Sequence, residues 1–353
     1  MTILWSLVAD RIGRRRTVAI LSCLMVVGGL LFAFASRFDI LLLGAFTGTI
    51  SATSSEVGAF LTVEQAVLPQ TAPAERRTWL FSLYAFAANV AQSLGALFAG
   101  VAVALATSAG LSGPDVFRPL FVLYALVGAA NLAIFLTLSD RVELVRVEAK
   151  RAWIGIDRSR GVVARLAALF AVDAFAGGLV VQSLVAYWFN LRWGFTPEQL
   201  GVLFFGVNML SGLSLLAAGR LAARIGLVNT MVFTHLPSNI LLMLVPLMPT
   251  GGLAAALFLA RMSISQMDVP TRQSYVMAVV APHERTAAAG LTNVARSAAT
   301  AFAPTLTGYA FSVAAFGVPF FVAGGLKIAY DLLLYRSFRS LRPPEETSPE
   351  QAQ

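Results

Sequence analysis

Charged residues are absent from several long stretches of the chain. The longest stretches without Asp, Glu, Lys or Arg lie at residues 17–36, 79–114, 119–139, 199–219, 225–260 and 297–326. A helix that crosses the hydrocarbon core of a bilayer needs about 20 predominantly apolar residues. Because each stretch is long enough for one such helix, and some for two, the pattern predicts a protein that crosses a membrane many times.

Ten complete membrane-spanning helices are predicted where apolar runs are bounded by charged residues or by turns with Pro or Gly. Their approximate bounds are 17–36, 40–65, 78–106, 118–138, 162–190, 198–222, 228–248, 252–278, 287–312 and 318–338. The predicted fold class is therefore an all-α integral membrane protein. Residues 1–9 are apolar but too short to cross a bilayer, and they resemble the end of a further helix.

Composition supports this class and excludes others. Hydrophobic residues make up 58% of the 353 residues and charged residues 12%, against roughly 25% charged in an average soluble domain. The single cysteine, Cys23, permits no intramolecular disulfide and no cysteine-built metal site. The two histidines, His235 and His283, are far apart in the sequence, so the chain offers few ligands for a zinc or haem site. We expect no metal and no cofactor.

Lysine and arginine gather in alternate loops, which predicts the orientation in the membrane. The net charge of +8 is better explained by this loop charge than by nucleic-acid binding, because the chain is so apolar. The rich loops include residues 11–16, 141–160 and 336–342, whereas the opposite loops hold only Arg37, Arg118 and Arg192. The rich side should face the cytoplasm, so we expect a plasma-membrane protein with a cytoplasmic C-terminus.

Two short segments recur at nearly the same offset. Residues 6–13 (SLVADRIG) resemble residues 219–226 (GRLAARIG), and residues 73–76 (PAER) resemble residues 282–285 (PHER). Both pairs fall in predicted cytoplasmic turns, so we favour a duplicated bundle over a chance match. The predicted parts are a partial N-terminal bundle (1–138), a cytoplasmic linker (139–161), a C-terminal bundle (162–338) and a cytoplasmic tail (339–353).

Residues 9–15 (ADRIGRR) resemble the signature turn between helices 2 and 3 of the major facilitator superfamily, G-x-L-A-D-R-x-G-R-R/K. Ser6 and Val8 depart from that motif, and the second copy has Ala223 in place of the aspartate. The resemblance implies that residues 17–36 correspond to family helix 3. The chain would then lack helix 1 and most of helix 2, which usually complete a set of twelve.

The same resemblance implies a conformational role for the turn, which in the family latches the two halves in the outward-open state. Asp10 precedes a helix, where a carboxylate satisfies free N–H groups and the positive end of the helix dipole. A simple positive-inside anchor is the alternative, which we favour for the flanking arginines. The residues of the two turns are Asp10, Arg11, Gly13 and Arg14, with Gly219, Arg224 and Gly226 in the second copy.

Ionisable groups inside a membrane span cost about 2.5–3.5 kcal/mol each and usually face a cavity or a partner. Arg261, Asp268 and Arg272 are spaced to share one face of a continuous helix, and the last two are an i,i+4 pair. Arg296 lies at a similar depth on the next span. A structural salt bridge and a place on the substrate path are equally good interpretations of this set.

Asp173 lies mid-span with no charged neighbour one turn away on its own helix, so an isolated carboxylate that carries a proton is predicted. Glu56 is a second candidate for the proton or substrate path. Lys327 and Asp331 are i,i+4 on the last span and are interpreted as a structural pair. His235 is interpreted as a hydrogen-bonded core residue rather than a proton relay.

The function favoured by these features is a secondary active transporter of a small molecule, working by alternating access and coupled to protons. Residues 95–100 (GALFAG) resemble, without its proline, the Gly/Pro-rich motif that exporters of the family carry on helix 5, and this resemblance implies export, or antiport with protons. Four intramembrane cations suggest an anionic substrate, and a drug-like one is the alternative. We expect a monomer. No phosphate-binding loop for ATP and no nucleophile–base pair of an enzyme is found, and a non-transporting sensor or scaffold, or a degenerate transporter, remains the alternative function.

Overall fold

A computed structural model describes residues 14–46, 60, 77–138, 159–280, 284–339 and 341. Within these ranges the regular elements are all helices. The chain divides into two compact units. Of the described residues, the first unit takes in 14–46, 60, 77–84, 95–138 and 197–201, and the second takes in 85–94, 159–196, 202–280, 284–339 and 341.

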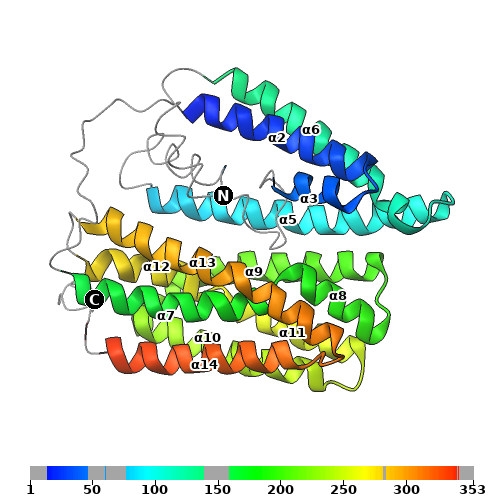
Figure 1. Ribbon diagram of the computed structural model, residues 1–353. Helices are drawn as coiled ribbons and strands as arrows, with labels where there is room; N and C mark the ends of the chain where they lie inside the picture. The colour runs from blue at the N-terminus through cyan, green and yellow to red at the C-terminus, as the bar shows by residue number, and fades with distance from the viewer. Residues whose placement is uncertain are drawn as a thin grey trace. The chain divides into compact units, whose positions relative to one another are not determined.

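The first unit contains α2 (Arg14–Phe34), α3 (Phe38–Phe46), most of α5 (Arg77–Ser108), a short 3-10 helix η3 (Gly113–Phe117) and α6 (Arg118–Leu136). Helices α2 and α6 lie side by side along their length, as Figure 1 shows. The rings of Phe32 and Phe121 stack across this contact with their centroids 5.1 Å apart. Burial of apolar side chains between the two helices holds this pair together.

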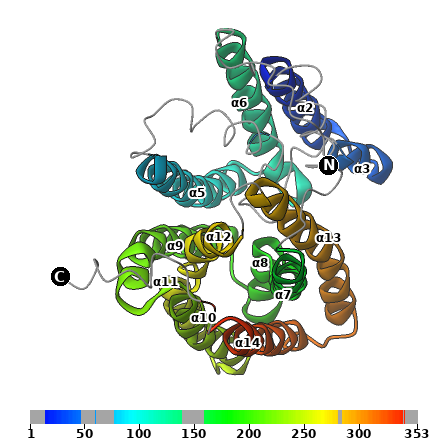
Figure 2. The same cartoon turned by 90° about the vertical axis from the view of Figure 1, so that its left-hand side faces the viewer.

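The second unit contains the remaining helices. They are α7 (Arg160–Leu179), α8 (Gln182–Trp193), most of α9 (Pro197–Ile225), α10 (Leu227–Leu244), η5 (Val245–Leu247), α11 (Gly251–Ser265), α12 (Asp268–Val279), α13 (Arg285–Ser312) and α14 (Val318–Phe338). Helix α7 packs against α13 and α14, while α10 packs against α14, α11 and α12 (Figure 2). This arrangement brings α7, α10, α12, α13 and α14 together around one interior.

Helices α7 and α13 approach each other closely. A Cβ atom on Gly178 would lie 2.7 Å from the Cβ of Ala303, so the contact depends on the absence of a side chain at residue 178. Thr300 Oγ1 donates to the carbonyl of Ala174 at 3.2 Å, and Thr307 Oγ1 donates to the carbonyl of Leu179 at 2.7 Å. Small residues and hydroxyl groups are typical of helix contacts within membranes.

Two of the predicted spans are interrupted, which corrects the prediction of continuous helices at 162–190 and 252–278. Helix α7 ends at Leu179 and α8 begins at Gln182, with Val181 in an extended conformation. Gly177 and Gly178 lower the helix propensity just before this break. Helix α11 ends at Ser265 and α12 begins at Asp268. Pro270 explains the second break, because its ring clashes with the carbonyl four residues earlier and it donates no backbone hydrogen bond.

Of the predicted span 40–65, the structure describes only residues 40–46, at the end of α3, and residue 60. The other predicted spans coincide with helices within a few residues. By length and composition, seven helical segments of the described residues could cross a bilayer. They are Arg15–Phe34, Leu83–Ser108, Gly113–Leu136, Arg160–Trp193, Pro197–Ala222, Leu227–Leu247 and Val318–Phe338.

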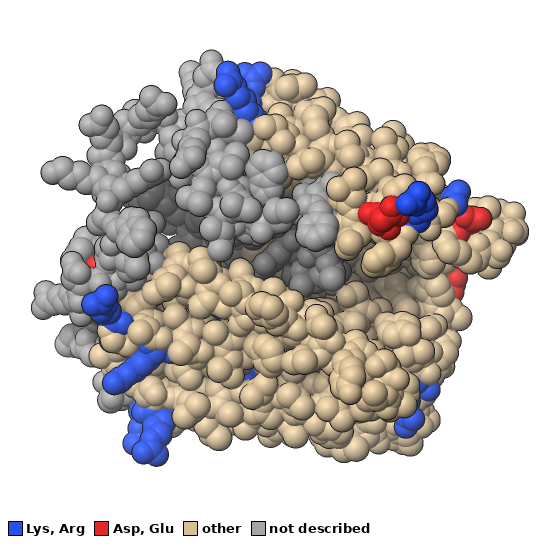
Figure 3. Space-filling view, viewed as in Figure 1, with Lys and Arg blue, Asp and Glu red and all other residues tan. Residues whose placement is uncertain are grey.

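Large apolar side chains are exposed on the outside of both units, as a lipid-facing surface requires. Phe233, Phe302 and Leu332 are examples in the second unit, and Leu126 is one in the first. On the face of the second unit that Figure 3 shows, blue side chains lie chiefly at the helix ends and the middle is almost entirely tan. Most of the charged residues in the helix middles are instead buried.

Candidate functional site

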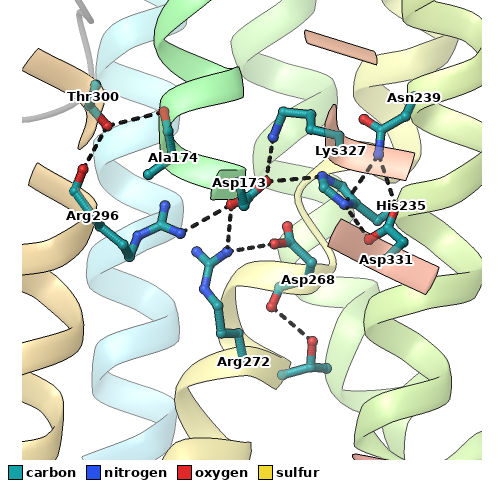
Figure 4. Close-up of polar contacts among 11 residues, drawn as sticks. Asp173, Ala174, His235, Asn239, Asp268, Arg272, Arg296, Thr300, Lys327 and Asp331 are labelled. Carbon is teal, nitrogen blue, oxygen red and sulfur yellow. Dashed lines mark hydrogen bonds and ion pairs between the residues drawn. The ribbon is translucent and has the colours of Figure 1, made fainter. Parts of the chain in front are cut away.

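Asp173 is the centre of a buried cluster of charged side chains in the second unit (Figure 4). Lys327 Nζ of α14 donates to Asp173 Oδ1 at 2.6 Å. On the other oxygen, Asp173 Oδ2 accepts from Arg272 Nη1 at 3.2 Å and from Arg296 Nη1 at 3.0 Å. Three basic side chains from three helices thus converge on one carboxylate of α7.

Arg272 also contacts a second carboxylate on its own helix. Its Nη1 atom donates to Asp268 Oδ2 at 2.8 Å, one turn earlier on α12. The break before α12 places Asp268 in the first turn of that helix, where a carboxylate is favoured by the helix dipole. The guanidinium group of Arg272 lies 5.5 Å from the ring centroid of Phe170, which covers it on the side of α7.

A histidine joins this cluster to a third carboxylate. His235 Nδ1 lies 2.8 Å from Asp331 Oδ1, and Asn239 Nδ2 donates to Asp331 Oδ2 at 3.0 Å. The opposite ring nitrogen, His235 Nε2, lies 3.9 Å from Asp173 Oδ1. The imidazole of α10 therefore stands between the carboxylates of α7 and α14 (Figure 4).

The members of the cluster differ in exposure. Side-chain exposure is 9% or less for Asp173, Arg272 and Lys327, but it is 28% for Arg296. Arg296 is therefore the basic member of the cluster that water or a solute reaches most easily.

Arg261 of α11 lies apart from these contacts. It is buried, its Nη1 atom lies 3.0 Å from the sulfur of Met262, and its guanidinium group lies 5.8 Å from the ring of Phe258. Its Nε atom has no hydrogen-bond partner among the residues that the structure describes. The break between α11 and α12 removes Arg261 from the helix that carries Asp268 and Arg272, which corrects the prediction that all three share one face of a single helix.

The predicted contacts have mixed outcomes. The i,i+4 pair of Asp268 and Arg272 is confirmed. The prediction of an isolated carboxylate at Asp173 is wrong, because its three basic partners come from other helices. The predicted pair of Lys327 and Asp331 is also wrong, since Lys327 contacts Asp173 and Asp331 contacts His235. His235 is hydrogen-bonded in the core, as predicted.

Several predicted residues lie outside the described ranges. They are Glu56 and the turn residues Asp10, Arg11 and Gly13, and Arg14 is described only as the first residue of α2. In the second copy of the turn, Gly219 and Arg224 lie near the end of α9 and Gly226 lies between α9 and α10. Gly226 has φ 85°, which an L side chain rarely adopts, so a glycine is required there.

Sequence reasoning did not place Asn239, Lys327, Asp331 or His235 in one site. The sequence did contain a signal for a shared site. Helix α10 carries His235 and Asn239, and α14 carries Lys327 and Asp331, and each pair is spaced i,i+4. Two such pairs on apolar helices indicate one buried polar face on each helix.

Comparison with known proteins agrees with this architecture. A sequence profile of the Major Facilitator Superfamily matches residues 1–304. An uncharacterized membrane protein of Saccharomyces cerevisiae is 27% identical over 358 residues, which cover 92% of this chain and 80% of the yeast protein.

Solved transporter structures share the fold. A bacterial homologue of the human lysosomal transporter Spinster, in an inward-facing and unoccupied conformation, gives a TM-score of 0.68 at 15% identity, covering 99% of this chain and 88% of that one. A D-xylose–proton symporter gives 0.69 at 15% identity, covering 95% and 83%. The human organic anion transporter MFSD10 gives 0.59 at 17% identity, covering 94% and 80%.

The sequence profile covers most of the chain, and the helical fold matches that of transporters rather than enzymes. The chain is therefore a multi-pass membrane protein that belongs to the major facilitator superfamily.

Proposed function

We propose that this protein is a proton-coupled secondary active transporter of a small molecule, working by alternating access, and that the Asp173 cluster is its coupling site. The observation that carries the proposal is the convergence of Lys327, Arg272 and Arg296 on Asp173. Charged groups at such depth are costly and are a mark of ion and substrate paths in membrane proteins. A contact that needed only to hold helices together could use uncharged side chains at lower cost.

The hydrogen bonds of the cluster indicate where a proton can bind. Lysine and arginine only donate, so both oxygens of Asp173 act as acceptors and the carboxylate is the ionised form. Asp331 accepts from Asn239 Nδ2, and as an ionised carboxylate it also accepts from His235 Nδ1. The Nε2 atom of His235 is then the position that gains or loses a proton.

Protonation of His235 Nε2 breaks no hydrogen bond recorded among the described residues. It also places a positive charge 3.9 Å from Asp173 Oδ1, where it competes with Lys327 for that oxygen. A proton on His235 would therefore loosen one of the links that join α7 to α14, and this is the type of bistable contact that alternating access needs.

The rest of the proposal concerns topology. The arginine-rich loops support a cytoplasmic C-terminus in the plasma membrane. The duplicated segments support an N-terminal bundle over 1–138 and a C-terminal bundle over 162–338, joined by a cytoplasmic linker. The backbone of Gly226 supports a tight turn at the second copy of the signature. Export is the alternative direction of transport, and it rests on the glycine-containing segment 95–100 alone.

The test is a pH measurement on proteoliposomes that contain the purified protein and trapped pyranine. Sugars, nucleosides, peptides and organic acids are added outside, each as a labelled compound, and both interior pH and uptake are followed. We expect one class to move together with protons, and a protonophore to abolish its accumulation. Asp173→Asn and His235→Gln should lose the pH change, whereas Arg192→Gln, on the exposed end of α8, should keep it.

Uptake that is indifferent to a protonophore would contradict the proton coupling. A labelled solute that binds but does not cross the membrane would contradict transport and favour a sensor.

A further inference from the structure

The fixed charges of the cluster are balanced. The acidic members are Asp173, Asp268 and Asp331, and the basic members are Arg272, Arg296 and Lys327. With His235 neutral the charges of these six residues cancel, and a proton on His235 adds one positive charge to that of buried Arg261, which acts on Asp268 and Asp173. In a low-dielectric interior such an excess of positive charge is costly unless an anion accompanies it.

Arg296 is the member of the cluster that is built to receive an anion. Its Nη1 atom contacts Asp173, while its Nε and Nη2 atoms make no hydrogen bond to the residues that the structure describes. The N–H bonds of Nε and Nη2 are parallel, and this edge of a guanidinium group binds a carboxylate through two hydrogen bonds. Arg272 and Lys327 are less suited, because their side chains are almost fully buried.

The surroundings of Arg296 on α13 are polar and accessible. Asn293 and Ser297 are exposed, and Thr300 is half-buried. These residues lie three before, one after and four after Arg296, so they share its side of the helix at about 100° per residue. Phe302, Leu306 and Tyr309 are exposed on the opposite side.

This division of α13 indicates which side meets lipid. The helix has 28 residues, long enough to cross a bilayer. A partly exposed arginine with neighbouring amide and hydroxyl groups does not face hydrocarbon, whereas an exposed row of Phe, Leu and Tyr does. The Arg296 side of α13 therefore faces away from the hydrocarbon of the bilayer.

We propose that the transported molecule carries a single carboxylate, that this carboxylate binds the Nε–Nη2 edge of Arg296, and that one proton accompanies it on His235. The inference rests on the proposed function and names its substrate class and stoichiometry. The anion adds one negative charge and the proton one positive charge, so loading leaves the net charge of the cluster unchanged. Both leave on the other side of the membrane, and no covalent bond is made or broken in the substrate.

The experiment compares acids with their own amides. The purified protein is titrated with nicotinate and nicotinamide, gluconate and gluconamide, and salicylate and salicylamide at constant ionic strength, with binding followed by thermal shift. We expect an acid to bind at least about tenfold more tightly than its amide, as a charge-assisted pair predicts. Arg296→Gln should abolish this preference, Arg296→Lys should keep only part of it, and Arg192→Gln should leave it unchanged.

Flux then tests the stoichiometry with the acid that binds. Labelled uptake and pyranine signal should give one proton for each anion, and an imposed potassium diffusion potential should not change the rate. His235→Gln should retain binding of the acid but lose the proton movement. Size-exclusion profiles of the variants show whether each is folded.

The inference is overturned if no acid of the panel binds, if the amides bind as tightly as the acids, or if Arg296→Gln keeps the preference. Proton-driven uptake of a neutral solute would overturn the anion site while leaving proton-coupled transport intact. Anion uptake that carries no proton would overturn the role of His235 and the proton coupling of the proposed function, while leaving the anion site intact.

Discussion

Replacing Asp173 by asparagine changes the cluster without changing its volume. The amide group of the variant offers one oxygen where the carboxylate offers two, and it carries no charge. Lys327, Arg272 and Arg296 would then face a neutral side chain. Removing one partner of a buried ion pair typically costs about 3–5 kcal/mol, because it leaves an uncompensated buried charge.

The structure indicates which of the three basic groups accounts for most of this loss. Arg272 keeps Asp268 at 2.8 Å, and the side chain of Arg296 is 28% exposed and can be hydrated. Lys327 donates to Asp173 at 2.6 Å and has no second acceptor among the described residues. We therefore expect the double variant Asp173→Asn with Lys327→Met to be more stable than Asp173→Asn by at least about 1 kcal/mol, a typical coupling of residues in contact.

The free energy of unfolding is measured by titrating detergent-solubilised protein with sodium dodecyl sulfate and following helix content by circular dichroism. Asp115→Asn serves as the control, because Asp115 and Arg118 form an exposed pair that is worth less than about 1 kcal/mol. A loss for Asp173→Asn no larger than that of the control would refute this account. So would a double variant whose loss is the sum of the two single losses.

Three further predictions concern other contacts within the second unit. Gly178→Leu should destabilise the protein by about 1–3 kcal/mol, because any side chain at residue 178 meets Ala303, and Gly252→Leu is the matched control since no atom lies near that residue. Glu284→Ala should lower the free energy of unfolding by about 1–3 kcal/mol, because fully buried Glu284 accepts a hydrogen bond from the backbone N–H of Ser159 at 3.0 Å. Glu284→Gln should recover most of that loss, and equal losses in the Ala and Gln variants would contradict the prediction. Trp188→Ala should cost about 3–5 kcal/mol in the same assay, because the ring centroid of buried Trp188 lies 4.5 Å from that of Phe320, and a loss below about 1 kcal/mol would contradict it.

The helices were predictable from sequence because their apolar length is fixed by the membrane. Pro270 is a local sequence signal for the helix break before Asp268. The signal for the break before Gln182 is weaker, because it consists only of the pair Gly177 and Gly178. Periodicity alone favoured continuous spans at both places, since the residues around the breaks are mostly apolar.

The charged cluster was predictable only in part, and sequence separation explains the limit. The contact of Asp268 with Arg272 spans four residues of one helix, so helix geometry is enough to predict it. Lys327 is 154 residues from Asp173, and the same geometry pointed to Asp331 instead. Such contacts depend on which helices are neighbours in space. Local patterns in a single sequence do not show which helices are neighbours.

The break between α11 and α12 has an electrical consequence. Asp268 and Arg272 both belong to α12, so a swing of this short helix carries a negative and a positive charge together. Moving one elementary charge across the membrane potential involves about 2.3 kcal/mol per 100 mV, but an ion pair that moves as one body displaces almost no net charge. A rearrangement that pivots at Gln266 and Met267 would therefore proceed at the same rate in a polarised and a depolarised membrane.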